Sequence, residues 1–161
     1  MWLAEVQAKA KRHNQILFSK ESSLLADLCH LIDQSNRRVL ILWALELAEE
    51  TALQLAERYP EDLRPREAID TARAWAAGEI KMPIAKRAIL NCHAMAKELT
   101  DPADIARCHA VGQACSVVHT AGHALGYPMY ELTAIVRCRL GPSVPLPWHD
   151  SSGSPVWRSA F

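Results

Sequence analysis

Residues 59–82, YPEDLRPREAIDTARAWAAGEIKM, combine a turn with two prolines, a charged helical segment and a glycine stop. Pro65 suits the first turn of a helix, where its missing N–H has no intrahelical partner to lose. Gly78 suits the residue after a helix, because glycine adopts the left-handed backbone that often ends one. The segment therefore predicts a helix over 65–77.

The sequence on both sides of this segment has the same helical period, and no strand-like alternation persists. Apolar spacing and proline positions predict further helices over 2–18, 22–34, 37–58, 83–99, 102–125 and 128–139. Half of the residues are hydrophobic but only 6% are aromatic, which favours close packing through small side chains. A chain of 161 residues is typical of one domain. We expect an all-α fold, a single domain of six or seven helices packed as antiparallel hairpins over residues 1–140.

Residues 141–161, GPSVPLPWHDSSGSPVWRSAF, contain four prolines and five serines. Proline cannot continue a helix, because it lacks an N–H and clashes with the preceding turn. This composition predicts an irregular Pro/Ser-rich C-terminal arm.

The charge balance and the cysteines limit the function classes. Lys+Arg 18 balance Asp+Glu 18, so no general attraction to nucleic acid or to a membrane is expected. The longest aliphatic run, VLILWAL at 39–45, is too short to span a bilayer. The first residues carry charges where a signal peptide would be apolar. With five cysteines in no regular framework, the expected location is the cytoplasm.

The helix expected over 37–58 has two contrasting faces. Leu40, Ala44, Leu47, Ala48, Thr51 and Leu55 share the face expected to be buried. Glu46, Glu50 and Glu57 share the opposite face, with Glu49 beside them, and make an acidic surface that could meet a basic partner. The early turns are apolar all round, which predicts deep burial at that end.

Arg66, Asp70 and Arg73 lie on one edge of the helix over 65–77, at spacings of four and three. Two interpretations are open. The residues could form a structural ladder of ion pairs, or the two arginines could clamp a carboxylate or phosphate ligand. The ladder is favoured, since such pairs are common on helix surfaces.

The segment 101–126, DPADIARCHAVGQACSVVHTAGHALG, would place Cys108, Gly112, Cys115, His119, Gly122 and Gly126 on one stripe of a continuous helix. Histidines four apart can present two imidazoles to zinc, so Cys115, His119 and His123 are candidate metal ligands, with Cys92 or His93 contributed by the helix over 83–99. The favoured interpretation is a packing seam of small residues. Thr120 stands where the zinc-protease motif requires Glu.

Other catalytic and cofactor signals are absent from the sequence. Cys115 and His119 are residue types used in nucleophilic catalysis, but nothing indicates an oxyanion hole or a reactive thiol. There is no phosphate-binding glycine loop and no basic–aromatic stretch typical of nucleic-acid grooves. We expect no cofactor and no enzymatic activity.

Three stretches carry a family resemblance: RRVLILWALELAEE at 37–50, the segment 59–82, and VVHTAGHALG at 117–126. Together they resemble the bacterial Imm-5-like putative immunity proteins over roughly residues 37–137. The matching positions are Trp43, Ala44, Ala48, Glu49, Arg64, Pro65, Arg66, Ala68, Ile69, Ala72, Arg73, Ala74, Trp75, Gly78, Glu79, Ile80, His119, His123 and Ala124.

This resemblance implies a small helical protein that binds and neutralises a cognate protein toxin without catalysis. The candidate contacts are the acidic surface, through Glu46, Glu50 and Glu57, and the charges at Arg66, Asp70 and Arg73. Two alternatives remain. One is a metal-binding or small-molecule-binding protein that uses His119, His123 and nearby Cys or His. The other is an oligomeric scaffold whose helices pair between copies of this chain.

Overall fold

The structure is a computed structural model that describes residues 2–140; the expected arm at 141–161 lies outside them. Seven α-helices and two short 3₁₀ turns make up this part of the chain, and no strand occurs in it. In order they are α1 (Trp2–Lys11), η1 (Ser23–Leu25), α2 (Ala26–Gln34), α3 (Arg37–Arg58), α4 (Arg64–Ala76), α5 (Met82–Met95), α6 (Pro102–Ser116), η2 (Ala121–Leu125) and α7 (Gly126–Leu140). The all-α single-domain prediction is confirmed.

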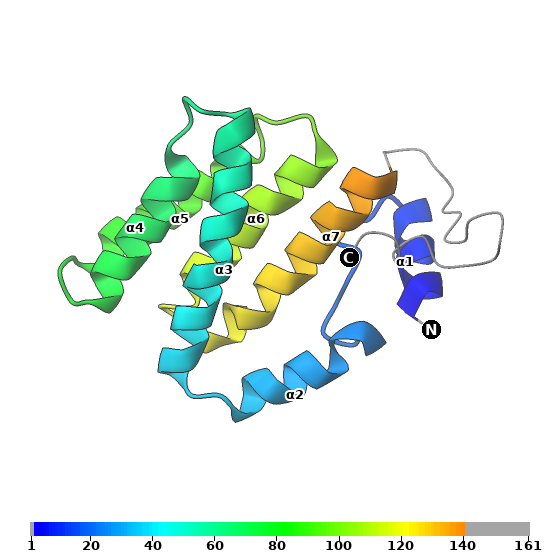
Figure 1. Ribbon diagram of the computed structural model, residues 1–161, viewed down its shortest axis with the longest axis horizontal. Helices are drawn as coiled ribbons and strands as arrows, with labels where there is room; N and C mark the ends of the chain where they lie inside the picture. Colours follow the sequence, from blue (N-terminus) through cyan, green and yellow to red (C-terminus); the bar gives the residue numbers. More distant parts are fainter. Residues whose placement is uncertain (1, 141–161) are drawn as a thin grey trace.

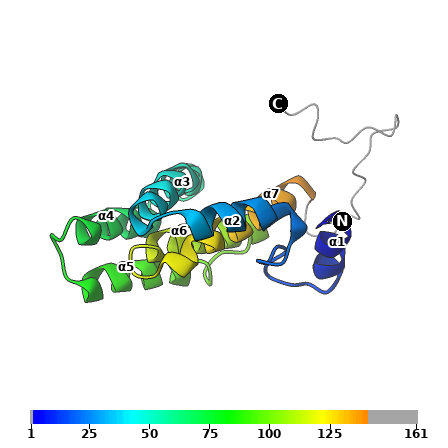
Figure 2. The same ribbon diagram turned by 90° about the horizontal axis from the view of Figure 1, so that it is seen from below.

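Helix α6 is the centre of the bundle, because it contacts α3, α4, α5 and α7. The α4–α5 hairpin packs on one side of it and α7 on the other (Figure 1). Helix α3 crosses over this layer (Figure 2). Alanine makes the close approach possible: Ala44 and Ala48 of α3, Ala68 and Ala72 of α4, and Ala110 and Ala114 of α6 all have no exposed surface.

Local signals fix most helix ends. Pro65, Pro83 and Pro102 each lie in the first turn of a helix. The Asp101 side chain caps α6 by accepting hydrogen bonds from the backbone N–H groups of Ala103 and Asp104 at 2.8 and 3.2 Å. Gly78 ends α4 at φ +78°, the left-handed backbone expected there.

The first predicted helix, 2–18, is wrong beyond Lys11. His13 adopts a left-handed φ of 55°, which turns the chain out of the helix. After this turn, Leu17 and Phe18 are buried again, each 2% exposed. They pack with Val6 and Leu25 in a second small core. This core fastens the N-terminal segment to α7, whose Leu132 and Val136 pack against it.

The helix predicted over 102–125 is also wrong beyond Ser116. The backbone N–H groups of Val117, Val118 and His119 each bond to a carbonyl three residues earlier, so the α-helix tightens and stops. Thr120 is extended at φ −143°, and η2 then leads into α7. β-branched valines and Gly122 favour helix weakly, which fits the break. The break lets α7 fold back along α6.

Candidate partner-binding surface

The outer face of α3 carries an exposed row of side chains at helical spacing, which we call the α3 ridge. Its apolar members are Val39, Leu42 and Leu53, with exposed fractions of 50%, 62% and 62%. Its acidic members are Glu46, Glu50 and Glu57, all exposed. The prediction that the early turns of α3 are deeply buried is therefore wrong for Val39 and Leu42. A helix that is apolar all round still presents one face to solvent when its neighbours lie on the other side.

The three glutamates of the α3 ridge have no ion-pair partner within residues 2–140. The face opposite the α3 ridge holds Ala44, Ala48, Thr51 and Leu55, each at most 1% exposed, as the sequence indicated. The α3 ridge is thus a mixed apolar and acidic surface that the bundle itself leaves unused.

Glu49 of α3 does not belong to the α3 ridge, because its side chain forms ion pairs with α4. Its carboxylate accepts from Arg66 Nη1 at 2.7 Å and pairs with Arg73 Nη2 at 3.0 Å. Arg66 also pairs with Asp70 at 3.1 Å, and the hydrogen bond that Arg66 donates to Asp70 raises the pKa of Arg66. Both guanidinium groups are therefore occupied by carboxylates of this chain. This geometry favours the ladder interpretation, with α3 supplying the partner that the sequence did not indicate.

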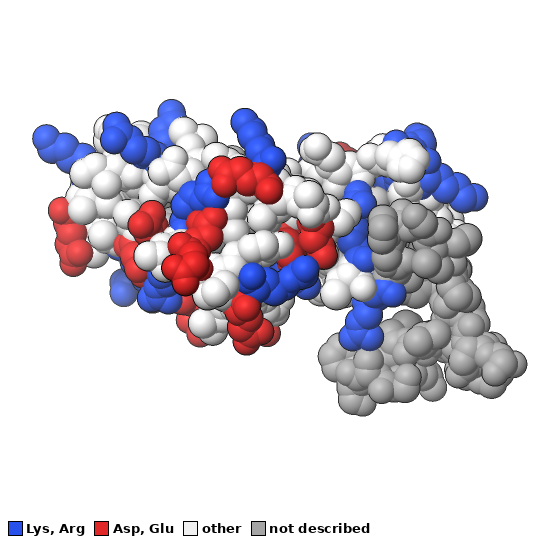
Figure 3. All heavy atoms as spheres, turned by 90° about the horizontal axis from the view of Figure 1, so that it is seen from above, with Lys and Arg blue, Asp and Glu red and all other residues white. Residues whose placement is uncertain are grey.

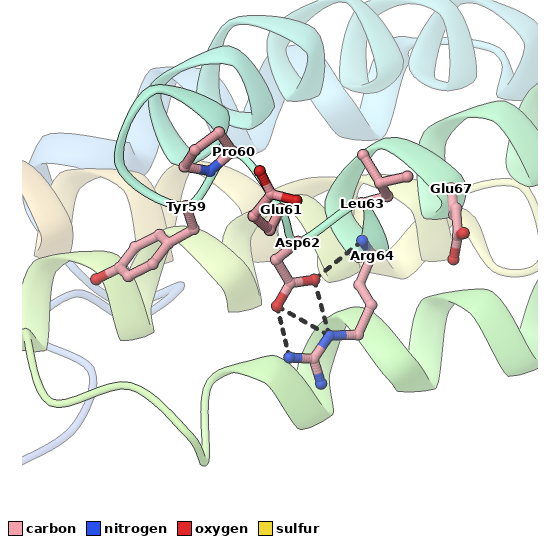
Figure 4. A pocket seen from close by; sticks show the side chains of 7 residues that line it. All are labelled: Tyr59, Pro60, Glu61, Asp62, Leu63, Arg64 and Glu67. Atoms are coloured by element: carbon pink, nitrogen blue, oxygen red, sulfur yellow. Dashed lines mark hydrogen bonds and ion pairs between the residues drawn. The ribbon is translucent and has the colours of Figure 1, made fainter.

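The turn between α3 and α4 contains a second ion-pair group. Arg64 pairs with Asp62 (Figure 4), with Nη2 and Oδ2 2.6 Å apart. The same Nη2 lies 2.7 Å from Oε2 of Glu98, in the turn that follows α5. The hydrogen bond from Arg64 lowers the pKa of Asp62. The group ties the turn to the end of α5 and neutralises Arg64.

On the face in Figure 3, acidic and basic side chains are interspersed across the helical body.

Asp104 is a buried carboxylate that sequence reasoning missed. Its side chain is 1% exposed and lies 2.8 Å from Arg58 Nη1, 2.9 Å from Arg107 Nη1 and 2.7 Å from the hydroxyl of Tyr59. Burial, together with this hydrogen bond, raises the pKa of Tyr59 to about 12. Asp104 therefore joins the end of α3 to the start of α6. In the sequence, the position of Asp104 near the start of a helix indicates only a capping role. Its partners Arg58 and Tyr59 are remote in sequence, so no local pattern points to them.

The structure does not place the candidate metal ligands as the sequence suggested. Because α6 ends at Ser116, His119 and His123 do not lie on one α-helix, and that premise of the metal hypothesis is wrong. Cys115 is fully buried, and burial raises the pKa of its thiol. His123 Nδ1 lies 2.8 Å from Gln113 Oε1. Within residues 2–140, no cluster of three or more His, Cys, Asp or Glu side chains has the geometry to hold a metal ion.

His119 packs against Trp75 of α4, with ring centroids 4.8 Å apart in an edge-on arrangement. Its two ring nitrogens are buried and have no hydrogen-bond partner in the described structure. Burial and the nearby Arg37 lower the pKa of His119, so its ring is favoured in the neutral form. Trp75 is partly buried against the main core, as expected for a packing anchor.

The small residues of α6 act as a packing seam at Gly112. A Cβ built on Gly112 would lie 2.4 Å from Nε2 of His93, so only glycine lets the His93 ring lie on α6. The same ring reaches His109, with the two Nδ1 atoms 2.8 Å apart. The favoured sequence interpretation, a packing seam, holds at this position.

The family model described as Imm-5 like putative immunity protein matches residues 30–144, and the chain belongs to this family. No curated protein and no solved structure matches the chain. Among the helices within residues 2–140, none is long and apolar enough to cross a membrane.

Proposed function

We propose that this protein binds a cognate toxin through the α3 ridge and neutralises it by covering the toxin's active site, without catalysis. Family membership supports the class of partner. The observation that carries the proposal is the α3 ridge itself, where Leu42 and Leu53 are each 62% exposed beside glutamates that have no ion-pair partner in residues 2–140. Exposed leucines grouped at one face are typical of interaction sites.

The dimensions of the α3 ridge suit a protein interface. From Val39 to Glu57 it extends about 27 Å at a rise of 1.5 Å per residue. A standard interface buries about 800 Å² on each partner, which a ridge of this length and its flanks can supply. Arg66, Asp70 and Arg73 on α4 stay part of the proposed surface as flanking charges, since all three are exposed.

The charges of the α3 ridge select the partner. Glu46, Glu50 and Glu57 would face like charges if two copies of this chain paired through the ridge, which costs energy. A toxin surface with basic side chains around an apolar centre would instead complement it. For this reason we favour a toxin partner over the oligomeric scaffold.

Co-expression with a cognate toxin tests the proposal. The native chain is expected to restore growth, and the L42S/L53S variant is expected to lose protection, because apolar anchors at interface centres carry most binding energy. The matched control is L31S, since Leu31 is 61% exposed on α2, away from the α3 ridge. Protection by L42S/L53S equal to that by L31S would refute the α3 ridge as the binding surface.

A further inference from the structure

A second surface lies along the α4–α5 hairpin, where two open hollows of about 660 and 310 Å³ adjoin. Glu67 lines both, and together we call them the hairpin groove. Its lining residues are Tyr59, Pro60, Glu61, Asp62, Leu63, Arg64, Glu67, Thr71, Pro83, Ile84, Arg87, Ala88 and Asn91. No residue of the α3 ridge is among them, so the groove is a separate surface.

Each hollow of the hairpin groove has one exposed apolar side chain. Leu63 at the α3–α4 turn is 61% exposed, and Ile84 in the first turn of α5 is 53% exposed. While these side chains face solvent, they add no burial free energy to the bundle. Each can instead make an apolar contact with a bound segment. Asn91 of α5 is exposed, and its side-chain amide makes no hydrogen bond within residues 2–140. Its amide can bond the backbone of an extended chain.

Two exposed carboxylates lie on either side of Leu63 in the hairpin groove, and one of them, that of Glu67, lines both hollows. Arg64 is neutralised by Asp62 and Glu98, so it does not offset the other carboxylates. Glu61 and Glu67 have no ion-pair partner in the described structure, and Figure 4 shows them on either side of Leu63. A lysine or arginine side chain placed there would pack its aliphatic stem on Pro60 and Leu63 and meet two carboxylates with its charge.

We propose that the hairpin groove binds an extended segment of a protein partner in which a basic residue is flanked by apolar ones. In an extended chain, alternate side chains point to the same face, so the pattern is apolar, any, basic, any, apolar. Such a segment spans about 13 Å between its outer residues at 3.3 Å per residue. Charge complementarity selects this occupant. Arg87, which is exposed and lines the second hollow, has no ion-pair partner within residues 2–140 and can donate to a backbone carbonyl of the segment.

The test is an NMR titration of the full ¹⁵N-labelled chain with the capped peptide Leu-Ser-Lys-Ser-Leu. We expect saturable shifts of the backbone amides of Glu61, Glu67, Ile84 and Asn91, and little binding of the matched peptide Leu-Ser-Glu-Ser-Leu. The E61Q/E67Q variant should bind the lysine peptide about fivefold more weakly, the effect of losing exposed charge pairs. The control variant E46Q/E57Q removes two carboxylates of the α3 ridge and should bind it unchanged.

Three outcomes would overturn the proposal. These are shifts located on the α3 ridge, equal binding of the lysine and glutamate peptides, and no saturable shift at millimolar peptide. Sedimentation of I84S against the native chain addresses another occupant: a native dimer that becomes monomeric in I84S would mean that a second copy fills the groove. Because the α3 ridge and the hairpin groove share no residue, loss of toxin protection in L42S/L53S does not bear on this result.

Discussion

His93 of α5 and His109 of α6 face each other with their Nδ1 atoms 2.8 Å apart. Only one hydrogen can lie between two such atoms, so the pair cannot hold both rings protonated without repulsion. Burial, and to a smaller extent the nearby His109 and His123, lower the pKa of His93 to about 4. Burial also lowers the pKa of His109.

This pair predicts an acid-sensitive fold. The folded pKa of His93 lies below its ordinary value of 6.5, so the unfolded chain binds more protons and the folded chain loses stability as pH falls. The contribution is fully present above about pH 6.5 and is lost toward about pH 4, by at most about 3 kcal/mol. Urea unfolding at several pH values should show this loss for the native chain and a smaller loss for H93Q. An equal pH slope in both proteins would show that His93 is not responsible.

Asp104 predicts a large loss of stability on substitution. In D104A the guanidinium groups of Arg58 and Arg107 lose a buried partner, and the Tyr59 hydroxyl loses its acceptor. Removing one member of a buried charge group costs about 3–5 kcal/mol. Urea unfolding measures it, with D70A as control, because Asp70 is 53% exposed and its pair with Arg66 is worth less than about 1 kcal/mol. Similar losses in D104A and D70A would contradict the role given to Asp104.

The ion pair of Glu49 with Arg73 is expected to contribute a modest coupling energy between α3 and α4. The double-mutant cycle of E49Q and R73Q should give a coupling energy of about 0.5–1 kcal/mol, because the carboxylate is 25% exposed and water screens the pair. Coupling of this size supports the ladder. Absence of coupling, together with binding of phosphate that R73Q abolishes, would instead favour the ligand clamp.

The five cysteines are expected to differ in their reactivity toward alkylating reagents. Burial raises the pKa of Cys92 and of Cys115, and it raises the pKa of Cys108 to about 12, so all three stay protonated and shielded near neutral pH. Cys138 on α7 is exposed and Cys29 on α2 is partly exposed. Iodoacetamide followed by peptide mass spectrometry should label these two in the native protein and all five after unfolding. Fast native labelling of Cys115 would show a reactive thiol environment.

The sequence predicted what depends on local spacing and failed where distant contacts decide. The α3 bounds, 37–58, follow from a long periodic run that ends before Pro60, and the structure has the same bounds. His13 ended α1 without a Gly or Pro to signal it. The Asp104 group needs residues from α3 and α6, so no local pattern reveals it.

The proposed partner-binding surface was only half visible in the sequence. The periodicity placed the three glutamates of α3 together, because they share a face whatever the surroundings are. It could not place Leu42 and Leu53 beside them in solvent, since an apolar helix does not show which of its sides the bundle covers. The hairpin groove was hidden for the same reason, because the sequence does not show that Leu63 and Ile84 face solvent.

Gly112 predicts a specific failure of the α5–α6 contact. In G112A the new methyl group would lie 2.4 Å from Nε2 of His93, so the ring must rotate away from α6 and give up its hydrogen bond to His109. Forcing a side chain out of a packed position costs about 1–3 kcal/mol. The control is G122A, because a methyl group on Gly122 meets nothing closer than 3.9 Å. Thermal melts should therefore separate the two alanine variants clearly. The double variant G112A/H93A should recover part of the stability, since it removes the ring that the methyl group displaces. If G112A alone melts like G122A, His93 moves aside at little cost and the contact is not a constraint on the bundle.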